Sequence, residues 1–363
     1  MTRLLVVDDS PLMRRLLGVI FEAEEDFTVA FARNGEEAIE QLHAFQPDVV
    51  TLDVHMPGMD GFECLDRIMV EKPCPVVMVS SLTAEGAGET LQALELGAID
   101  FIPKPAGAVT LEMDMLAPRL LEKVRAAATA RLRPSLRLAD RVRARSGSAM
   151  KRRHIVPGQR PVRVPVPAGV AGPQGLVLVG TSTGGPQALD ALLGPLPGDF
   201  PWPILIAQHM PATFTGPLAR RLDRLCALEV RELDAPSALT PGVWVARGDA
   251  DLVIRKQGKV LIGSPAPSDP AHRWHPSVDR MVRSAMNLLP AAQLIGVLMT
   301  GMGNDGAAAM AELRAAGGRT IAEAQETAVV WGMPGELVKA GGAEVVAPLE
   351  RIAERLIGLL PCE

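Results

Sequence analysis

Short apolar runs alternate with amphipathic stretches along the first hundred residues. Residues 12–24 and 36–45 repeat apolar side chains every three to four positions, the spacing of a helix that buries one face. Apolar runs between such stretches predict five strands, at residues 4–7, 28–32, 49–52, 76–79 and 99–102. Strands that alternate with helices form a doubly wound parallel sheet with right-handed crossovers. The first part of the chain is therefore predicted to be a doubly wound α/β domain.

The same alternation resumes after residue 174. Apolar runs there predict further strands at residues 176–179, 204–207, 243–246, 294–300 and 319–322. A pair of runs around Gln257-Gly258, at residues 252–255 and 259–262, has the pattern of a hairpin and predicts an antiparallel excursion or a sheet edge. The second part of the chain is therefore predicted to be a mostly parallel, doubly wound α/β domain.

The segment between these two patterns has a different composition. Residues 116–138 have a helical, Arg-rich pattern, and residues 146–173 are rich in Pro, Gly and basic side chains with no sustained apolar period. Between Arg119 and Arg163, 14 Lys or Arg stand against two acids, whereas the whole chain has a net charge of −5. We therefore expect a first domain at residues 1–120, a basic linker at 121–173 and a second domain at 174–363.

Composition narrows the class of protein. No apolar stretch approaches the roughly 18–20 residues of a membrane span, and the N-terminus becomes acidic too soon for a secretion signal. The four cysteines are widely spaced and form no metal or redox motif. We therefore expect a cytoplasmic protein.

Three carboxylates and one lysine follow predicted strands in the first domain. Asp8 and Asp9 come after the first strand, Asp53 after the third and Lys104 after the fifth. Because the carboxyl ends of parallel strands share one edge, these side chains should converge. Crowded carboxylates repel and favour a hard cation such as Mg²⁺, beside which a carboxylate can attack phosphorus. For any one aspartate, helix capping or turn formation is the alternative.

The first domain resembles the receiver domain of two-component response regulators over essentially all of residues 1–120. The matching motifs are Asp8-Asp9-Ser10, Asp53-Val54-His55-Met56-Pro57-Gly58-Met59-Asp60-Gly61, Ser80-Ser81 and Lys104-Pro105. The resemblance implies a flavodoxin-like fold in which Asp53 accepts a phosphoryl group from a phosphohistidine of a sensor kinase. It also implies an Mg²⁺ site in which Asp9, Asp53 and the backbone carbonyl of His55 are ligands and Asp8 assists through water.

The same resemblance implies a switch. Ser80 would hydrogen-bond the phosphoryl group, Phe101 would occupy the aromatic switch position, and Lys104 would contact the phosphoryl oxygens. His55 departs from the pattern, because near relatives usually carry an acid there. The backbone carbonyl can still act as a ligand with histidine at position 55. The change of side chain, however, puts the rate of phosphoryl loss from Asp53 in question.

Three strand ends of the second domain carry Ser182, His209 and Asp305. A hydroxyl, an imidazole and a carboxylate at one sheet edge indicate a serine hydrolase. Gly180-x-Ser182-x-Gly184 formally matches a nucleophile elbow, but the α/β-hydrolase order is Ser, acid, His, and here His209 precedes Asp305. Backbone N–H groups of residues 301–306 are candidates for an oxyanion hole. Singly, the three residues could be a helix cap, a loop histidine and a turn former.

The chain as a whole resembles the chemotaxis-specific protein-glutamate methylesterase/glutaminase (CheB) family. The matching motifs of the second domain are Thr181-Ser182-Thr183-Gly184-Gly185-Pro186, Gln208-His209-Met210-Pro211, His275-Pro276-Ser277-Val278-Asp279, Thr300-Gly301-Met302-Gly303-Asn304-Asp305-Gly306 and Val329-Val330-Trp331-Gly332-Met333-Pro334. The resemblance implies a triad of Ser182, His209 and Asp305. Met302 would give its backbone amide to the oxyanion hole, and Thr183 would lie near the histidine.

The resemblance further implies a substrate and a reaction. Glutamate methyl esters of chemoreceptors would be hydrolysed with release of methanol, receptor glutamines would be deamidated, and no cofactor would be needed for hydrolysis. One motif departs from the family: the usual Ala-Pro-Gly-Asp-x-His is replaced by Ala246-Arg247-Gly248-Asp249-Ala250-Asp251. The lost histidine is not in the implied triad, so the chemistry should survive.

A receiver joined to a hydrolase suggests control by phosphorylation. We expect the unphosphorylated receiver to cover the catalytic strand ends, and modification of Asp53 to loosen that interface through Ser80 and Phe101.

Three rival functions remain open. A DNA-binding regulator is disfavoured because the basic residues lie outside the large second domain, so no nucleic acid is expected. A catalytically silent adaptor and a hydrolase of another signalling pathway are the other two.

Overall fold

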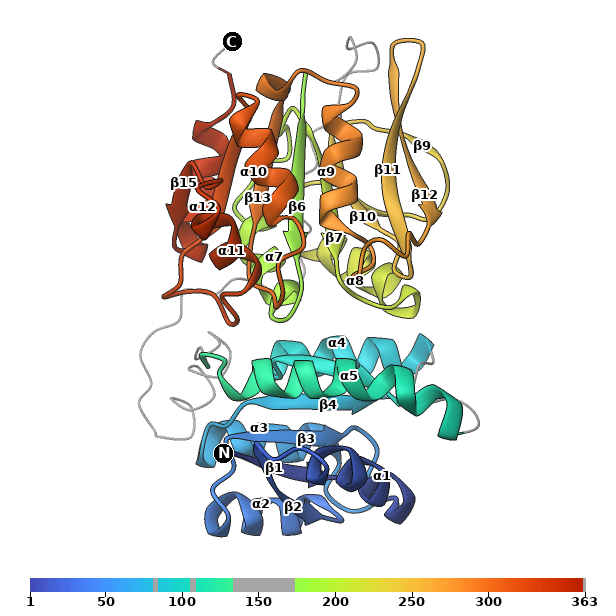
Figure 1. Cartoon of the computed structure of the whole chain (residues 1–363), viewed down its shortest axis with the longest axis vertical. Coiled ribbons are helices and arrows are strands. Elements are labelled where there is room, and N and C mark those ends of the chain that lie inside the picture. Colours follow the sequence, from blue (N-terminus) through green and yellow to red (C-terminus); the bar gives the residue numbers. More distant parts are fainter. Residues whose placement is uncertain (81–83, 105–108, 133–173, 362–363) are drawn as a thin grey trace. The chain divides into compact units, whose positions relative to one another are not determined.

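The structure is a computed structural model of the whole chain and describes residues 1–80, 84–104, 109–132 and 174–361 (Figure 1). The chain divides into two compact units, which are described one at a time. Among the described residues, no helix combines the length and the apolar character that a membrane span requires.

The first unit is built on a five-stranded parallel sheet with the strand order β2-β1-β3-β4-β5. The strands are β1 (Thr2–Val7), β2 (Phe27–Ala32), β3 (Val49–Asp53), β4 (Val76–Ser80) and β5 (Asp100–Pro103). The helices between and after them are α1 (Pro11–Glu22), α2 (Gly35–Ala44), α3 (Gly61–Glu71), α4 (Ala84–Leu96) and α5 (Val109–Ala128). The predicted doubly wound sheet is confirmed, and each predicted strand lies within two residues of an observed one.

Side-chain caps fix where the first helices begin. Ser10, Asn34 and Asp60 stand at the N-caps of α1, α2 and α3, and each side chain accepts a hydrogen bond from a backbone N–H of the first turn. Such caps satisfy amide groups that have no partner inside the helix. They place the loops that follow β1 and β3 at the carboxyl edge of the sheet.

The last helix of the first unit continues past residue 120, where the sequence pattern predicted the domain boundary. Val124 and Ala127 are fully buried, and Arg125 forms ion pairs with Glu24 and Asp26. These contacts tie the end of α5 to the first unit, so the start of the predicted linker is helical and packed. Residues 133–173, the rest of that linker, lie outside the described residues, and the division of the chain remains a prediction.

The second unit contains a seven-stranded parallel sheet with the strand order β15-β14-β13-β6-β7-β10-β8. The strands are β6 (Leu176–Thr181), β7 (Pro203–Gln208), β8 (Val230–Leu233), β10 (Gly242–Ala246), β13 (Leu294–Leu298), β14 (Arg319–Glu323) and β15 (Val345–Ala347). The sequence pattern missed β8 and β15. Both are short edge strands that are only partly buried, so neither has the continuous apolar run of a central strand.

The predicted hairpin is confirmed. Strands β11 (Ala250–Gln257) and β12 (Val260–Pro267) pair antiparallel, and with the short β9 (Ser237–Ala238) they form a separate three-stranded sheet. Gly258 has a φ of +60°, which suits glycine in the tight turn between the two strands. Leu252, Ile254 and Leu261 of this sheet join the buried core of the second unit.

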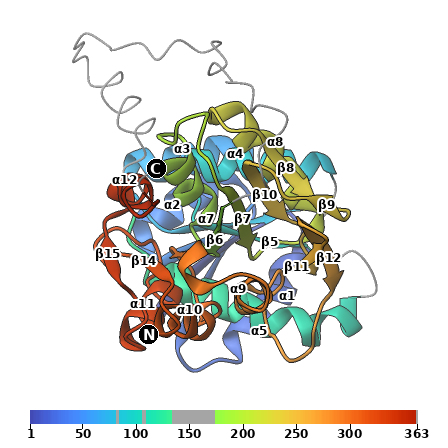
Figure 2. The same cartoon turned by 90° about the horizontal axis from the view of Figure 1, so that it is seen from above.

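Helices cover both faces of the seven-stranded sheet. They are α7 (Gly185–Leu193), α8 (Ala212–Leu225), α9 (Val278–Met286), α10 (Ala307–Ala315), α11 (Met333–Lys339) and α12 (Leu349–Gly358), with a short 3₁₀ turn at Ala291–Gln293. Figure 2 shows α7, α8 and α12 on one face and α9, α10 and α11 on the other, in agreement with their contacts. Because all strands are parallel, the loops after β6, β7 and β13 emerge at one edge.

Candidate active site and phosphoacceptor site

Ser182 lies immediately after β6, a strand whose six residues are all buried. Its backbone N–H donates to the carbonyl of Thr300 (3.0 Å), and its own carbonyl accepts from Nε2 of Gln208 (2.9 Å). A Cβ added to Gly185 would collide with the Gln208 side chain, so the turn into α7 requires glycine there. The strand end, the neighbouring strand and this turn together hold Ser182 at the carboxyl edge, with 5 % of its surface exposed.

His209 occupies the equivalent position on the adjacent strand. Thr181 of β6 pairs with Gln208 of β7, so Ser182 and His209 are the next residues along two strands that lie about 4.8 Å apart. The imidazole is buried, and its Nε2 lies 2.8 Å from Oδ2 of Asp305. Its Nδ1 has no hydrogen-bond partner among the described residues. One ring nitrogen is therefore held by a carboxylate, and the other is available to accept a proton.

Asp305 is the most heavily hydrogen-bonded member of this group. Besides His209, it accepts from the Ser277 hydroxyl (3.1 Å) and from the backbone N–H groups of Val278 (2.7 Å) and Asp279 (3.0 Å). These donors lie at the start of α9, where the helix dipole also favours a negative charge. Burial opposes the charge of Asp305, but the bonds from His209 and the helix N-terminus outweigh it and hold the pKa of this carboxyl below its usual value.

The loop between β13 and α10 brings backbone amides close to the serine. A Cβ added to Gly301 would lie 2.8 Å from Cβ of Ser182, so glycine permits this approach. Met302, the predicted oxyanion-hole donor, follows Gly301 directly and is buried. Thr183 is also buried, and its carbonyl accepts from the hydroxyl of Thr300 in the same loop. The loop is thus in position to offer an N–H group beside Ser182.

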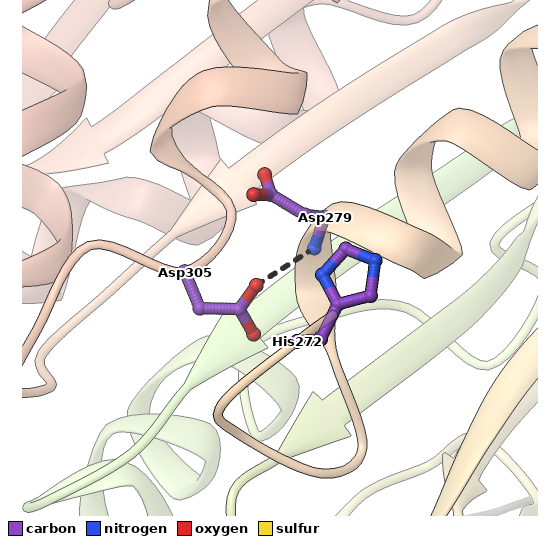
Figure 3. A group of neighbouring side chains, drawn as sticks. All are labelled: His272, Asp279 and Asp305. Atoms are coloured by element: carbon purple, nitrogen blue, oxygen red, sulfur yellow. Dashed lines mark hydrogen bonds between the residues drawn. The ribbon is translucent and has the colours of Figure 1, made fainter. Parts of the chain in front are cut away.

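Asp305 also belongs to a cluster of three ionisable side chains, with His272 and Asp279 (Figure 3). One ligand atom from each residue lies within 4.8 Å of the others, a spacing that could suit a metal ion. The oxygens of Asp305 are already engaged by four donors, and Oδ1 of Asp279 accepts from the backbone N–H of Ala309 (2.9 Å). Hydrogen bonds thus already use much of the acceptor capacity of these carboxylates that a cation would need.

The predicted acidic pocket of the first unit is present at the carboxyl edge of its sheet. Asp8 and Asp53 are buried, Asp9 is exposed, and one oxygen of each lies within 4.8 Å of the others. Nζ of Lys104 lies 2.7 Å from Asp53 and 3.1 Å from Asp8. Burial raises the pKa of Asp53, and this effect, helped by the charge of Asp8, outweighs the opposing influence of Lys104.

The other residues predicted for the first unit lie around this pocket. Phe101 is buried in β5, with Nζ of Lys123 5.1 Å from its ring centroid. The side chain of His55 points to α4, where its Nε2 lies 3.0 Å from Oε2 of Glu89. Ser80 ends β4, and its side chain lies outside the described residues.

Comparison with known proteins identifies both halves. A model of the response regulator receiver domain matches residues 4–114, and a model of CheB methylesterase matches residues 177–356. Over 98 % of both chains, the sequence is 55 % identical to protein-glutamate methylesterase/protein-glutamine glutaminase 2 of Rhodopseudomonas palustris strain BisB18. The chain belongs to the CheB methylesterase family. The catalytic domain of the Thermotoga maritima CheB methylesterase, 38 % identical, superposes with a TM-score of 0.50 and covers 53 % of this chain and all of that one.

A second relative supports the assignment along the whole chain. Protein-glutamate methylesterase/protein-glutamine glutaminase 3 of Rhodospirillum rubrum is 51 % identical over 98 % of this chain and 95 % of its own. Membership of the CheB family thus rests on full-length similarity and covers the receiver, the catalytic half and their order.

The departure from the CheB pattern at Asp251 has a structural explanation. Asp251 is buried, and its carboxylate accepts from Nδ1 of His275 (2.9 Å), the backbone N–H of Ser277 (2.7 Å) and Arg280 (2.6 Å). Burial opposes the charge, but these donors hold the pKa of Asp251 below its usual value. Asp251 therefore ties the hairpin to the segment that leads into α9, which in turn holds Asp305.

Sequence reasoning missed several supports of the site. Glu323, at the end of β14, is completely buried, and its carboxylate accepts from the backbone N–H of Thr300 (2.8 Å) and the hydroxyl of Thr327 (3.0 Å). It thereby fixes the start of the Gly301–Met302 loop. A glutamate directly after the strand predicted at residues 319–322 was the available signal, because a charge at the buried end of a strand needs partners.

Proposed function

We propose that Ser182, His209 and Asp305 are the catalytic triad of this CheB-family enzyme. The chain is a protein-glutamate methylesterase and protein-glutamine glutaminase that carries a receiver domain. The observation that carries the proposal is the hydrogen bond from His209 Nε2 to Asp305 Oδ2, made by residues 96 positions apart in the chain. Ser182 and His209 directly follow the paired strands β6 and β7. A second observation supports the proposal: Nδ1 of His209 is buried without a hydrogen-bond partner among the described residues, and such a buried polar atom needs an explanation, which a proton-accepting role supplies.

In the proposed mechanism, each member of the triad has its own step. Nδ1 of His209 accepts the hydroxyl proton as Oγ of Ser182 attacks the ester carbonyl, and Asp305 stabilises the imidazolium that forms. The backbone N–H of Met302 would donate to the oxyanion. The imidazolium then returns the proton to the leaving group, which departs as methanol from an ester or as ammonia from a glutamine. Water, deprotonated by His209, hydrolyses the acyl-enzyme to glutamate and free serine.

The receiver pocket supports phosphorylation at Asp53. Asp8, Asp9 and Asp53 offer hard oxygen atoms of the kind that Mg²⁺ prefers. Asp9, Asp53 and the backbone carbonyl of His55 would ligate the ion, with Asp8 assisting through water. The raised pKa of Asp53 fits a site whose carboxylates need added positive charge. Bound Mg²⁺ would neutralise charge on the incoming phosphoryl group. Oδ of Asp53 would attack the phosphorus of a phosphohistidine, and Lys104 would hold the transferred phosphoryl oxygens.

The partners follow from the two halves. We propose that methyl-accepting chemotaxis receptors are the substrate and that a chemotaxis sensor histidine kinase is the phosphodonor. Both reactions would take place in the cytoplasm, where the receptor's signalling helices and the kinase lie. Coverage of the catalytic edge by the receiver in the resting state remains a prediction.

Asp53→Asn should abolish activation without lowering the basal rate. A small phosphodonor such as acetyl phosphate, given with Mg²⁺, should raise methanol release by the wild type about fivefold or more, the scale of a typical coupling between two sites. The variant cannot form the acyl phosphate and should not respond. Methanol release from methylated receptor membranes measures both rates.

Asp48→Asn is the matched control for this test. Asp48 is partly exposed just before β3, at the opposite end of the strand from Asp53, where it pairs with Arg3. This variant should respond like the wild type. An undiminished response of Asp53→Asn would contradict phosphorylation at Asp53 as the activating event.

A further inference from the structure

The face of the His209 imidazole is covered by Trp274. The two ring centroids lie 5.6 Å apart and the ring planes differ by 12°, which is a stacked arrangement. The guanidinium carbon of Arg273 lies 4.9 Å from the centroid of the same tryptophan. Asp305 thus holds the edge of the imidazole while Trp274 holds its face.

The position of Trp274 is set by a rigid segment. Trp274 precedes His275 and Ser277, which are both tied to the buried carboxylate of Asp251. On the other side, a Cβ added to Gly303 would lie 3.2 Å from the indole Nε1, and the φ of Gly303 is +79°. The indole therefore lies between His209 and the loop that carries Met302, and both the close contact and the positive φ favour glycine at position 303.

We propose that Trp274 is a positioning residue for His209. The face of an indole ring carries negative charge density and attracts a cation lying over it. The imidazole becomes such a cation when it accepts the serine proton, so stacking stabilises the charged form and also fixes the ring plane that aims Nδ1. The charged groups around the pair are Asp305 on the imidazole edge, Arg273 on the indole, and Asp279 and His272 behind Asp305. This inference rests on the proposed role of His209.

Two substitutions at Trp274 distinguish the effect of its aromatic face on catalysis from the effect of its apolar bulk. Trp274→Leu keeps an apolar side chain but removes the π face, and it should lower kcat for methanol release about fivefold with KM within about twofold of the wild type. Trp274→Phe keeps an aromatic face and should retain at least about half of kcat. A small fluorophosphonate, which does not need the receptor surface, should label Ser182 more slowly in Trp274→Leu by the same factor as kcat.

Proton NMR reports the stacking without any activity. The chain has six histidines, and His209→Gln identifies the ring C–H signals of His209. The ring current of a stacked indole should move these signals upfield in the wild type, Trp274→Leu should return them downfield, and Trp274→Phe should keep part of the shift. If Trp274→Leu does not fold, the wild-type and Trp274→Phe spectra still show whether the ring at position 274 stacks on His209.

The outcomes distinguish this inference from the proposed triad. Full activity of His209→Gln would overturn the triad, whatever the spectra show. An inactive His209→Gln together with a wild-type kcat in Trp274→Leu would overturn the role of Trp274 alone. Equal losses of kcat in Trp274→Leu and Trp274→Phe, or histidine signals that do not move, would also overturn it.

Discussion

Ser182→Ala should lower kcat for methanol release at least about 10³-fold, to a rate close to the background of methylated receptor membranes. The hydroxyl is the atom that forms the acyl-enzyme, and alanine leaves the strand end and its backbone hydrogen bonds to Thr300 and Gln208 in place. The wild type and the variant should be compared on the same membranes, with thermal unfolding measured on both. A matching unfolding temperature shows that chemistry, not folding, was lost.

Ser237→Ala is the control for this substitution. Ser237 lies in β9, and its hydroxyl donates to the carbonyl of Ala235, two residues away, its one partner within the described parts of the chain. Loss of that hydroxyl should leave kcat within about twofold of the wild type, as is usual for a surface substitution. A rate for Ser182→Ala near that of Ser237→Ala would remove the serine from the mechanism.

Asp305→Asn should lower kcat about 10³- to 10⁴-fold with a much smaller effect on KM. An asparagine can turn its NH₂ group toward Nε2 of His209, and the ring proton then moves to Nδ1, the nitrogen that must accept the serine proton. The amide also carries no charge to stabilise the imidazolium. Steady-state kinetics on methylated receptor membranes separates kcat from KM.

Asp279→Asn is the comparison variant for Asp305→Asn. Its side chain accepts from Ala309, while the backbone N–H that donates to Asp305 is unchanged by the substitution. We expect a loss of kcat of no more than about tenfold. Equal losses in the two variants would assign the effect to the carboxylate cluster as a whole rather than to the partner of His209.

The pH dependence of stability gives a second measure of the Asp305 carboxylate. Because its pKa is lowered in the folded protein, the stabilisation is fully present above the unfolded-state pKa of about 3.9 and is lost as pH falls through the lower folded value. The free energy of unfolding of the wild type should therefore exceed that of Asp305→Asn near neutral pH, and the difference should shrink below about pH 4. Denaturant titrations at several pH values measure this difference, and one that stayed constant would contradict a charged Asp305.

The alternation of apolar and polar residues predicted much of the site because the five-stranded and the seven-stranded sheets, which carry the candidate residues, are both parallel. A side chain at or directly after the end of a central strand must lie at the carboxyl edge, and this rule predicts from the sequence alone that Asp8, Asp53 and Lys104 lie together, as they do. The same rule placed His209, which directly follows β7, at the carboxyl edge of the second sheet. Asp305 lies further along the loop after β13, and the start of α9 holds it beside His209. The apolar pattern did not predict the edge strands β8 and β15, because both are short and half exposed.

Contacts between loops could not be predicted in the same way. The stacking of Trp274 on His209 and the bond from Ser277 to Asp305 join segments that have no strand register in common. Their positions depend on the buried Asp251 network, which appeared in the sequence only as a departure from the family pattern. The orientation of His209, with Nε2 rather than Nδ1 toward the acid, likewise depends on loop geometry and not on spacing.

Covalent labelling tests the triad most directly. A fluorophosphonate probe should modify the wild-type chain at one residue, and peptide mass spectrometry should locate the label on Ser182. His209→Gln, which has no imidazole to accept the serine proton, should remain essentially unlabelled under the same conditions. A label on another serine, or equal labelling of His209→Gln and the wild type, would contradict the assignment of these residues as nucleophile and base.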